Sequence, residues 1–298
     1  MRTATADLAI RTPQFSPLVS TMPYYAWLII LSAVFLLAER VRPRVAGQGV
    51  FRPGWFRDLV FLVFNGHFLG AWISNLMRPA VTWLQAWAES VAVADGNLRG
   101  LLWASTAQTW PFWLQFLVAF LVMDFMQWCI HNLLHRVPWL WEFHKVHHSI
   151  EHMDWAGSMR FHWAEIVVYK TLQYLPLVWF GFSGDAIMAV AVIGTAIGHF
   201  NHANLNVNIG WLGYVLNNPR MHLWHHAHDE VQVRPVNFGI NLAVWDWIFG
   251  TAYVPAEPPA RLGFSNIERF PRTFVGEELY PLPVESVFRR LFRRSTGS

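Results

Sequence analysis

The chain has few of the residues on which soluble, disulfide-bonded or nucleotide-binding proteins depend. Its single cysteine, Cys129, excludes a disulfide or a thiolate metal cluster within one chain. Charged residues make up only 14% of the 298 positions, against about 25% in soluble domains. No GxGxxG or P-loop motif occurs, which argues against nucleotide binding. The formal net charge of +3 is modest, and we expect no nucleic acid partner.

Hydrophobic and aromatic residues are abundant instead. They account for 54% of the sequence, which contains 18 Trp and 23 Phe, more aromatic rings than one soluble core needs. Such rings are typical of a membrane protein, where they lie at the level of the lipid headgroups. No polar or Pro/Gly-rich linker divides the chain.

Five stretches could cross a bilayer, which takes about 20 apolar residues, with a range of roughly 17–25. They are 22–38, 59–77, 111–130, 166–182 and 186–200. The first three fit, the fourth is at the lower limit, and the fifth is short. Because a tight turn at 182–185 separates the last two, we expect a helical hairpin that need not reach the far surface. A pair of buried helices is the alternative for these two.

The distribution of arginines predicts the orientation in the membrane. The loop after the first stretch carries an excess of Arg, which marks it as cytoplasmic: Arg40, Arg42, Arg44, Arg52 and Arg57. The loop 78–110 has only two, and Trp83 and Trp87 predict a helix that lies in the opposite interface. Counting stretches from there places residues beyond 201 on the cytoplasmic side. The C-terminal segment agrees, with Arg289, Arg290, Arg293 and Arg294.

Thirteen of the fourteen histidines lie between His131 and His228. Ten of them form four groups: His131 and His135; His144, His147 and His148; His199 and His202; His222, His225 and His226. Spacings of three and four residues place side chains on one face of a helix. Neutral imidazole binds zinc, copper, iron and nickel, so these groups predict a polynuclear metal site. The topology brings all four groups to one face of the membrane.

Asp124 shares a helix face with the first histidine pair, since Asp124, His131 and His135 follow one another at i, i+7 and i+11. A carboxylate in an apolar span is costly unless it is paired. We expect it to orient a metal-binding imidazole; the alternative is that it reaches interfacial water.

The spacing of the histidines does not identify the metal. No HExxH zinc-protease motif and no ExxH pair of a soluble di-iron bundle occurs. Structural zinc sites typically include cysteine, which this chain cannot supply in number. Nine or ten imidazoles suffice for two metals, but spacing alone does not separate iron from zinc.

The ordered motifs resemble the fatty acid hydroxylase superfamily, also called the sterol desaturase family, of integral-membrane di-iron oxygenases. The resemblance covers about 124–251. It includes HxxxH at 131–135, FHKVHHS at 143–149, RFH at 160–162 with Glu165, HAN at 202–204, PRMHLWHH at 219–226, and the closing WD and FGT at 245–251.

This resemblance implies an all-α integral membrane fold, with about four to five membrane helices and a cytoplasmic helical cap around a His-rich di-metal site. It implies nine ligands: His131, His135, His144, His147, His148, His202, His222, His225 and His226. His162 is a further ligand or a second-shell residue, and His199 either completes the set or only hydrogen-bonds nearby. The expected division is 1–110, with N-terminal membrane helices and an interfacial loop; 111–255, the di-iron domain; and 256–298, a basic cytoplasmic tail.

The implied function is oxygen-dependent hydroxylation or desaturation of a lipid, a sterol, fatty acyl chain or ether lipid, at two iron ions. The lipid enters from the bilayer, and the electrons come from a separate donor protein. A divalent-metal transporter is an alternative, although its ligands should lie near the middle of the bilayer. A non-catalytic metal-binding membrane protein is another, although no motif is broken.

Overall fold

In the computed structural model, residues 21–95, 107–231 and 234–282 are described, and these are organised by helices. No strand longer than an isolated bridge occurs among them. The helices are α1 (Tyr24–Val41), α2 (Trp55–Val63), η2 (Phe64–Leu69), α3 (Gly70–Asp95), η4 (Ala107–Thr109), α4 (Phe112–Arg136), α5 (Pro138–His148), η5 (Trp155–Met159), α6 (Trp163–Trp179), α7 (Gly184–His202), η6 (Gly210–Tyr214), α8 (Pro219–His225), α9 (Val244–Ile248), η7 (Ile267–Arg269) and α10 (Phe274–Leu279). The predicted all-α fold is confirmed.

Four helical segments are long and apolar enough to cross a membrane: Tyr24–Val41, Trp55–Ala80, Phe112–Arg136 and Gly184–His202. Only 11% of the apolar window in α1 is buried inside the protein, and Ile29 and Leu37 are about two-thirds exposed. An apolar surface of this extent needs contact with lipid, because soluble monomers rarely expose such patches. The chain is therefore an integral membrane protein.

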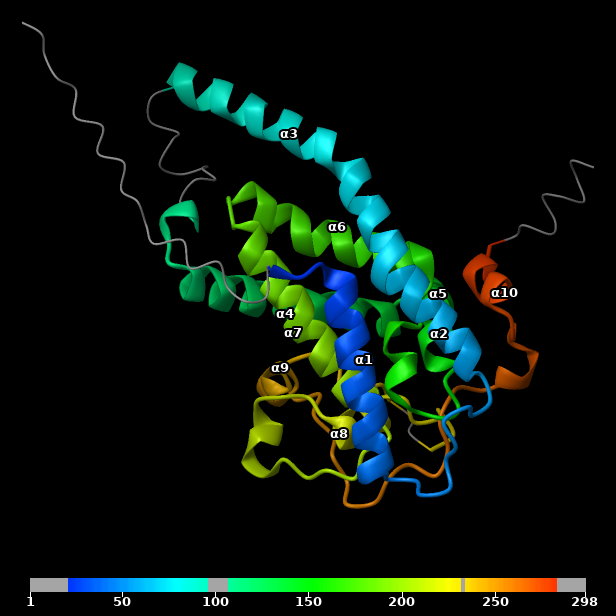
Figure 1. Ribbon diagram of the computed structural model, residues 1–298. Coiled ribbons are helices and arrows are strands. Elements are labelled where there is room, and N and C mark those ends of the chain that lie inside the picture. Colours follow the sequence, from blue (N-terminus) through cyan, green and yellow to red (C-terminus); the bar gives the residue numbers. More distant parts are fainter. Residues whose placement is uncertain (1–20, 96–106, 232–233, 283–298) are drawn as a thin grey trace, which may run out of the picture.

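Two details differ from the sequence-based expectation. The second helix of the predicted hairpin, α7, is among the four candidate spans. It is longer than the predicted stretch, because it continues through the polar residues Asn201 and His202. Its partner α6 has 17 residues and is not among them. Trp83 and Trp87 lie on a helix as predicted, beyond the candidate span that ends at Ala80, and the location of this helix in the opposite interface stays a prediction. Both side chains are exposed on α3, which runs unbroken past Pro79 in residues that favour helix (Figure 1).

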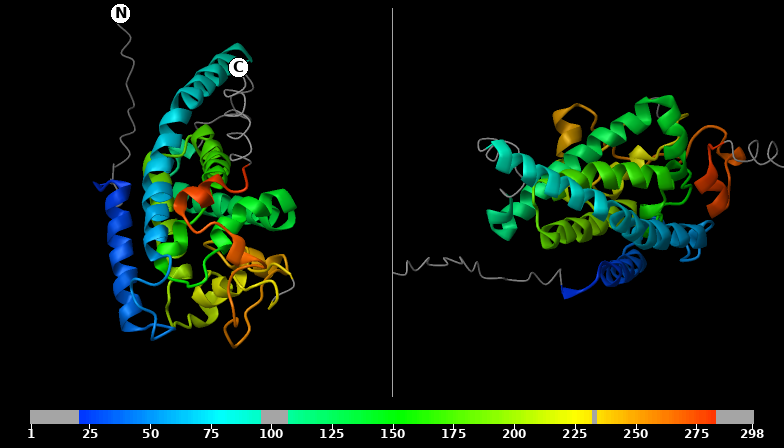
Figure 2. Two further views of the ribbon diagram at one scale, coloured as in Figure 1. Left: turned by 90° about the vertical axis from the view of Figure 1, so that its right-hand side faces the viewer. Right: turned by 90° about the horizontal axis from the view of Figure 1, so that it is seen from above.

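The segments that directly follow α7, including η6 and α8, lie at one end of the long helices, beside the C-terminal end of α1, whereas α10 lies beside α2 (Figures 1 and 2). The Arg44 amide donates a hydrogen bond to the Asn204 carbonyl there, and the Asn206 amide donates to Arg42. The buried Glu39 carboxylate accepts hydrogen bonds from the amides of Asn204 and Trp155. These bonds fix the end of α7, and with it His202, against α1. The arginines predicted at 289–294 lie outside the described residues.

A buried ion network joins α2, the region around η5 and α10. The Arg52 guanidinium contacts both Asp58, at 2.7 Å, and Asp154, at 2.6 Å. The Arg160 guanidinium contacts Asp58, at 3.0 Å, and Glu277, at 2.6 Å. All five side chains are buried. Because buried charges are costly without partners, this network constrains how the three regions dock.

We expect Asp58→Asn to destabilise the fold by about 3–5 kcal/mol, since it leaves two buried guanidinium groups short of negative charge. Thermal and denaturant unfolding of the purified protein in detergent measures the loss. As a matched control, Glu151→Gln breaks an exposed pair with Arg272 and should change stability by less than about 1 kcal/mol. Equal effects of the two substitutions would contradict a structural role for the network.

Candidate metal centre

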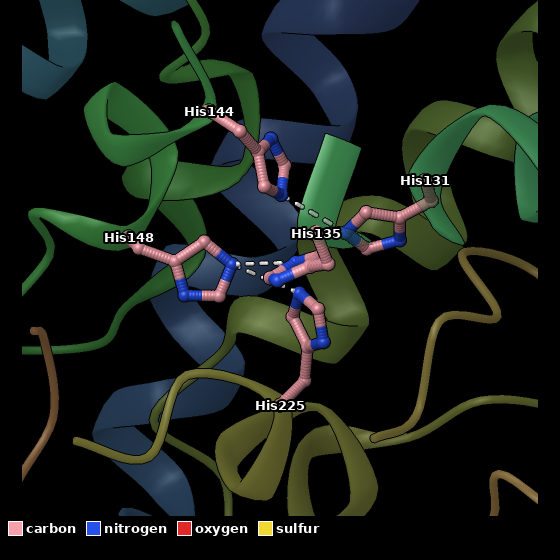
Figure 3. Close-up of side chains that lie close together, drawn as sticks. All are labelled: His131, His135, His144, His148 and His225. Atoms are coloured by element: carbon pink, nitrogen blue, oxygen red, sulfur yellow. Dashed lines mark hydrogen bonds between the residues drawn. The ribbon is translucent and has the colours of Figure 1, made fainter. Parts of the chain in front are cut away.

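The nine histidines implied as ligands come together in two groups at the end of the long helices. One group is His131, His135, His144, His148 and His225, and the other is His147, His202, His222 and His226. In each group one potential ligand atom per residue lies within 4.8 Å of all the others. Figure 3 shows the first group, with five imidazoles directed toward a common centre.

Two short helices contribute to both groups. On α5, His144 and His148 are one turn apart and face the first group, while His147 faces the second. On α8, His225 belongs to the first group, whereas His222 and His226 belong to the second. Each helix therefore presents imidazoles on two adjoining faces, and the two groups are neighbours. The ring centroids of His148 and His226, one from each group, are 4.5 Å apart.

One ring nitrogen of most of these imidazoles is held by an oxygen of the protein. Nδ1 contacts the Phe238 carbonyl in His131, the Glu165 carboxylate in His144, the Arg160 carbonyl in His147, the Gly198 carbonyl in His202 and the Val236 carbonyl in His225, at 2.7–3.1 Å. A carbonyl or carboxylate only accepts, so each of these Nδ1 atoms carries the proton. In a neutral imidazole the other nitrogen, Nε2, then presents a lone pair.

These lone pairs face one another. Nε2 of His131 lies 3.0 Å from Nε2 of His144, and both imidazoles have their Nδ1 proton engaged elsewhere. In the second group, Nε2 of His222 lies 3.1 Å from Nε2 of His202 and of His226. Nδ1 of His222 and of His226 has no hydrogen-bond partner among the described residues, so either nitrogen of these two rings can carry the proton. Two acceptors at the distance between His131 and His144 repel unless a proton or a cation lies between them. The donor set fits metal ions held by Nε2, with an oxygen behind Nδ1 fixing five of the nine rings.

The segment that supplies two of these carbonyls is held by buried carboxylates. Asp246 accepts hydrogen bonds from the amides of Phe238 and Gly239, and from the Trp128 indole. Asp124 accepts from the amides of Asn241 and Leu242 and from the Trp245 indole. The prediction that Asp124 orients an imidazole directly is wrong, because its oxygens are occupied by these donors. It fixes the loop whose Phe238 carbonyl holds His131.

The two histidines with uncertain roles lie outside both groups. His162 caps α6 by accepting a hydrogen bond from the Ala164 amide, and burial lowers its pKa to about 4, which keeps it neutral. His199 lies between two hydroxyl groups, Ser158 at 2.8 Å and Ser32 at 3.2 Å. Both side chains are fully buried and support the surrounding helices.

Glu165 is the functional residue to which the sequence analysis gave no role. Its buried carboxylate lies 3.0 Å from Nδ1 of His144. Carboxylates behind imidazoles fix the ring orientation and increase the basicity of the coordinating nitrogen. Its place one turn into α6, within the motif that begins at Arg160, was the available signal.

Two cavities border the histidines. A cavity of about 130 Å³ extends from His131, His147, His202 and His222 between the long helices. A second, of about 210 Å³, lies on the other side of the site and is bordered by His135, His148 and His225 together with Trp141 and Arg234. The histidines thus border one cavity within the helical bundle and a second one beside α5 and α8.

Burial lowers the pKa of the six imidazoles of α5 and of the segment 222–226 well below the usual 6.5, and neighbouring imidazoles lower it further. The residues concerned are His144, His147, His148, His222, His225 and His226. They are neutral near pH 7, which is the form that binds metal.

We expect the metal-free protein to lose stability steeply as the pH falls below about 6.5. Below that pH the unfolded chain takes up protons that these buried imidazoles do not. Each imidazole that stays neutral in the folded state then removes about 1.4 kcal/mol per pH unit. Unfolding temperatures between pH 8 and pH 5 measure the loss, and bound metal should shift it to lower pH. A flat profile in the metal-free protein would contradict burial of neutral imidazoles.

Comparison with known proteins agrees with this geometry. The model of the fatty acid hydroxylase family matches residues 116–251. Ornithine lipid hydroxylase OlsE from Rhizobium tropici is 29% identical over 149 residues, which is 50% of this chain and 45% of that protein. Alkylglycerol monooxygenase from Xenopus tropicalis is 27% identical over 53% of this chain and 33% of that protein. The human alkylglycerol monooxygenase is 31% identical over 45% of this chain and 29% of that protein.

The alignments thus cover less than half the length of these relatives. No solved structure matches the chain significantly. The matched region 116–251 contains all nine histidines of the two groups, the Glu165 carboxylate and the loop held by Asp246. The resemblance drawn from the motifs is confirmed, because residues 116–251 match the fatty acid hydroxylase family.

Proposed function

We propose that this protein is a membrane-bound, oxygen-dependent oxidoreductase that hydroxylates or desaturates a lipid at a centre of two iron ions. The convergence of nine buried imidazoles into two adjoining groups carries the proposal. Relatives that bear the names of a lipid hydroxylase and a monooxygenase favour hydroxylation over desaturation.

Five imidazoles in one group and four in the other fit one metal each, and they set two metals side by side. Iron is favoured over zinc by the family, since imidazole alone does not discriminate between them. When bound, the irons supply activation of molecular oxygen. The net reaction R–H + O₂ + 2e⁻ + 2H⁺ → R–OH + H₂O requires two electrons, which a separate donor protein must provide.

The protein itself would position the lipid and keep water away from the reacting carbon. The cavity between the helices ends at His131, His147, His202 and His222, and apolar side chains such as Phe120, Met123 and Val190 border it further in. Lipid can thus approach from the bilayer while the reacting carbon remains shielded from bulk water. The second cavity, near Trp141, gives a second approach to the histidines.

Orientation and domain division remain part of the proposal. The arginines that follow α1 support a site on the cytoplasmic face. A division into 1–110, 111–255 and 256–298 follows from the motifs. Residues 264–280 nevertheless pack on the membrane domain, where Phe264, Ile267 and Phe270 share a core cluster with Phe61.

We expect the purified protein to bind two irons per chain, and His222→Gln to lose about half of the iron, since the second group loses one of its four ligands. Metal analysis and absorption spectroscopy measure both. His199→Gln is the matched control, because it removes an equally buried imidazole whose hydrogen bonds are to serine hydroxyls and which belongs to neither group. Equal iron loss in the two variants, or stoichiometric zinc with no iron, would contradict the assignment.

We expect cells that contain the gene to accumulate one lipid class about 16 mass units heavier than in cells without it, or 2 units lighter if the reaction is desaturation. Comparative lipid mass spectrometry checks this, with the His222→Gln strain as the negative control. If no lipid changes but cellular metal content does, the chain is a metal transporter and the enzymatic proposal fails.

A further inference from the structure

One lysine lies inside the helical bundle without a carboxylate partner. Lys170, on α6, borders the cavity that leads to the histidines. Among the described residues its ammonium group forms no ion pair; it donates one long hydrogen bond, 3.4 Å, to the Tyr174 hydroxyl and lies 4.9 Å from the centroid of that ring. An ammonium group has three donors, so part of its capacity is free. A cation in such a place is costly and indicates a function.

Hydroxyl groups surround the same part of the cavity. Tyr24, Tyr174 and Thr195 border it with Lys170. Thr195 donates its proton to the Ala191 carbonyl, at 2.9 Å, so in the 2.6 Å contact between Tyr24 and Thr195 the tyrosine is the donor. Cation and hydroxyls together form a polar end of an otherwise largely apolar cavity, which we call the Lys170 end.

Two buried polar atoms that border the same cavity have no partner in the described part of the chain. The Gln173 amide nitrogen and the Tyr169 hydroxyl form no hydrogen bond with the described residues, and both side chains are about 95% buried. Leaving such a buried group without a partner is unfavourable. Both groups can donate, as Lys170 does, so what they lack is an acceptor.

The Lys170 end is at a defined distance from the histidines. Thr195 precedes His202 by two turns of α7, or about 10 Å along the helix axis. Lys170 follows Glu165, the partner of His144, by a turn and a half of α6, or about 8 Å. With carbon–carbon bonds of about 1.5 Å, an extended alkyl chain covers this distance in roughly six to ten carbons.

We propose that Lys170, with Tyr174, binds the anionic oxygen group of an amphiphilic substrate, a carboxylate or a phosphate, inside the bundle. The distance from Lys170 to the histidines then selects a carbon roughly six to ten positions from that group. This inference names a substrate class for the proposed function and rests on it only for the reaction, since binding needs neither oxygen nor reductant.

The test is a binding measurement on the full chain in phosphatidylcholine nanodiscs, without reductant. Radiolabelled hexadecanoate, hexadecyl phosphate and hexadecanol share one alkyl chain and differ in the headgroup. We expect at least one anion to bind tenfold more tightly than the alcohol. Whether the carboxylate or the phosphate binds better identifies the group. If the alcohol binds as tightly as both anions, or no ligand binds, the proposal is overturned.

Variants then assign the preference to the lysine. Lys170→Met should reduce anion affinity about tenfold and leave hexadecanol unchanged, whereas Lys170→Arg should retain the preference. Leu172→Met, at an exposed position of the same helix, is the control and should behave like the natural chain. If Lys170→Met retains the preference, the proposal fails; if it does not fold, Tyr174→Phe replaces it and should weaken anion binding alone. Absence of turnover with intact anion binding would instead count against the oxygenase.

Discussion

The arrangement of the site depends on hydrogen bonds that fix imidazole rings from behind. In His131, His144, His147, His202 and His225 the Nδ1 proton is bound by a carbonyl or carboxylate, which leaves Nε2 directed inward. Without these acceptors the rings could rotate about their side-chain bonds, and two neutral imidazoles would not keep their lone pairs 3 Å apart. The acceptors are mostly main-chain atoms, so the backbone itself determines the geometry.

Buried carboxylates in turn hold that backbone. Asp246 and Asp124 bind amides of the loop that carries the Phe238 carbonyl, and Asp58 and Glu277 bind the guanidinium of Arg160, whose own carbonyl holds His147. An ion pair between α2 and the region around η5 therefore also influences a metal-binding ring. Polar contacts are suited to this role in a membrane protein. Apolar helix faces are as stable against lipid as against one another, so apolar packing alone does not fix how the parts around the histidines dock.

The two cavities give the site different environments. The cavity within the bundle reaches the group of four and His131, whereas the cavity on the cap side reaches three members of the group of five. The oxygenase proposed above, with a membrane lipid and a separate electron donor, would use these two approaches separately. In that proposal the Lys170 end lies on the lipid side and would determine the choice of the reacting carbon.

Much of this could be predicted from the chain. Helical spacing of histidines, together with apolar runs of membrane length, predicted that the imidazoles gather at one end of a bundle, since both patterns are local. The division of His144, His147 and His148 between two groups could not, because it depends on how α5 docks against α4 and on where α7 and α8 place their own imidazoles. Asp124 was assigned to the wrong partner for the same reason: a stripe on one helix does not reveal which loop covers it.

The sequence by itself determined the membrane helices, the nine imidazoles and their family, because each rests on residue type and spacing along the chain. Tertiary structure alone decided which nitrogen faces a metal, which carboxylate stands behind which ring, and where an unpaired lysine lies relative to the site. These are contacts between residues that are distant in the sequence, such as Asp124 and Trp245, which are 121 positions apart. Such contacts depend on the docking of helices and loops, which a local pattern does not encode.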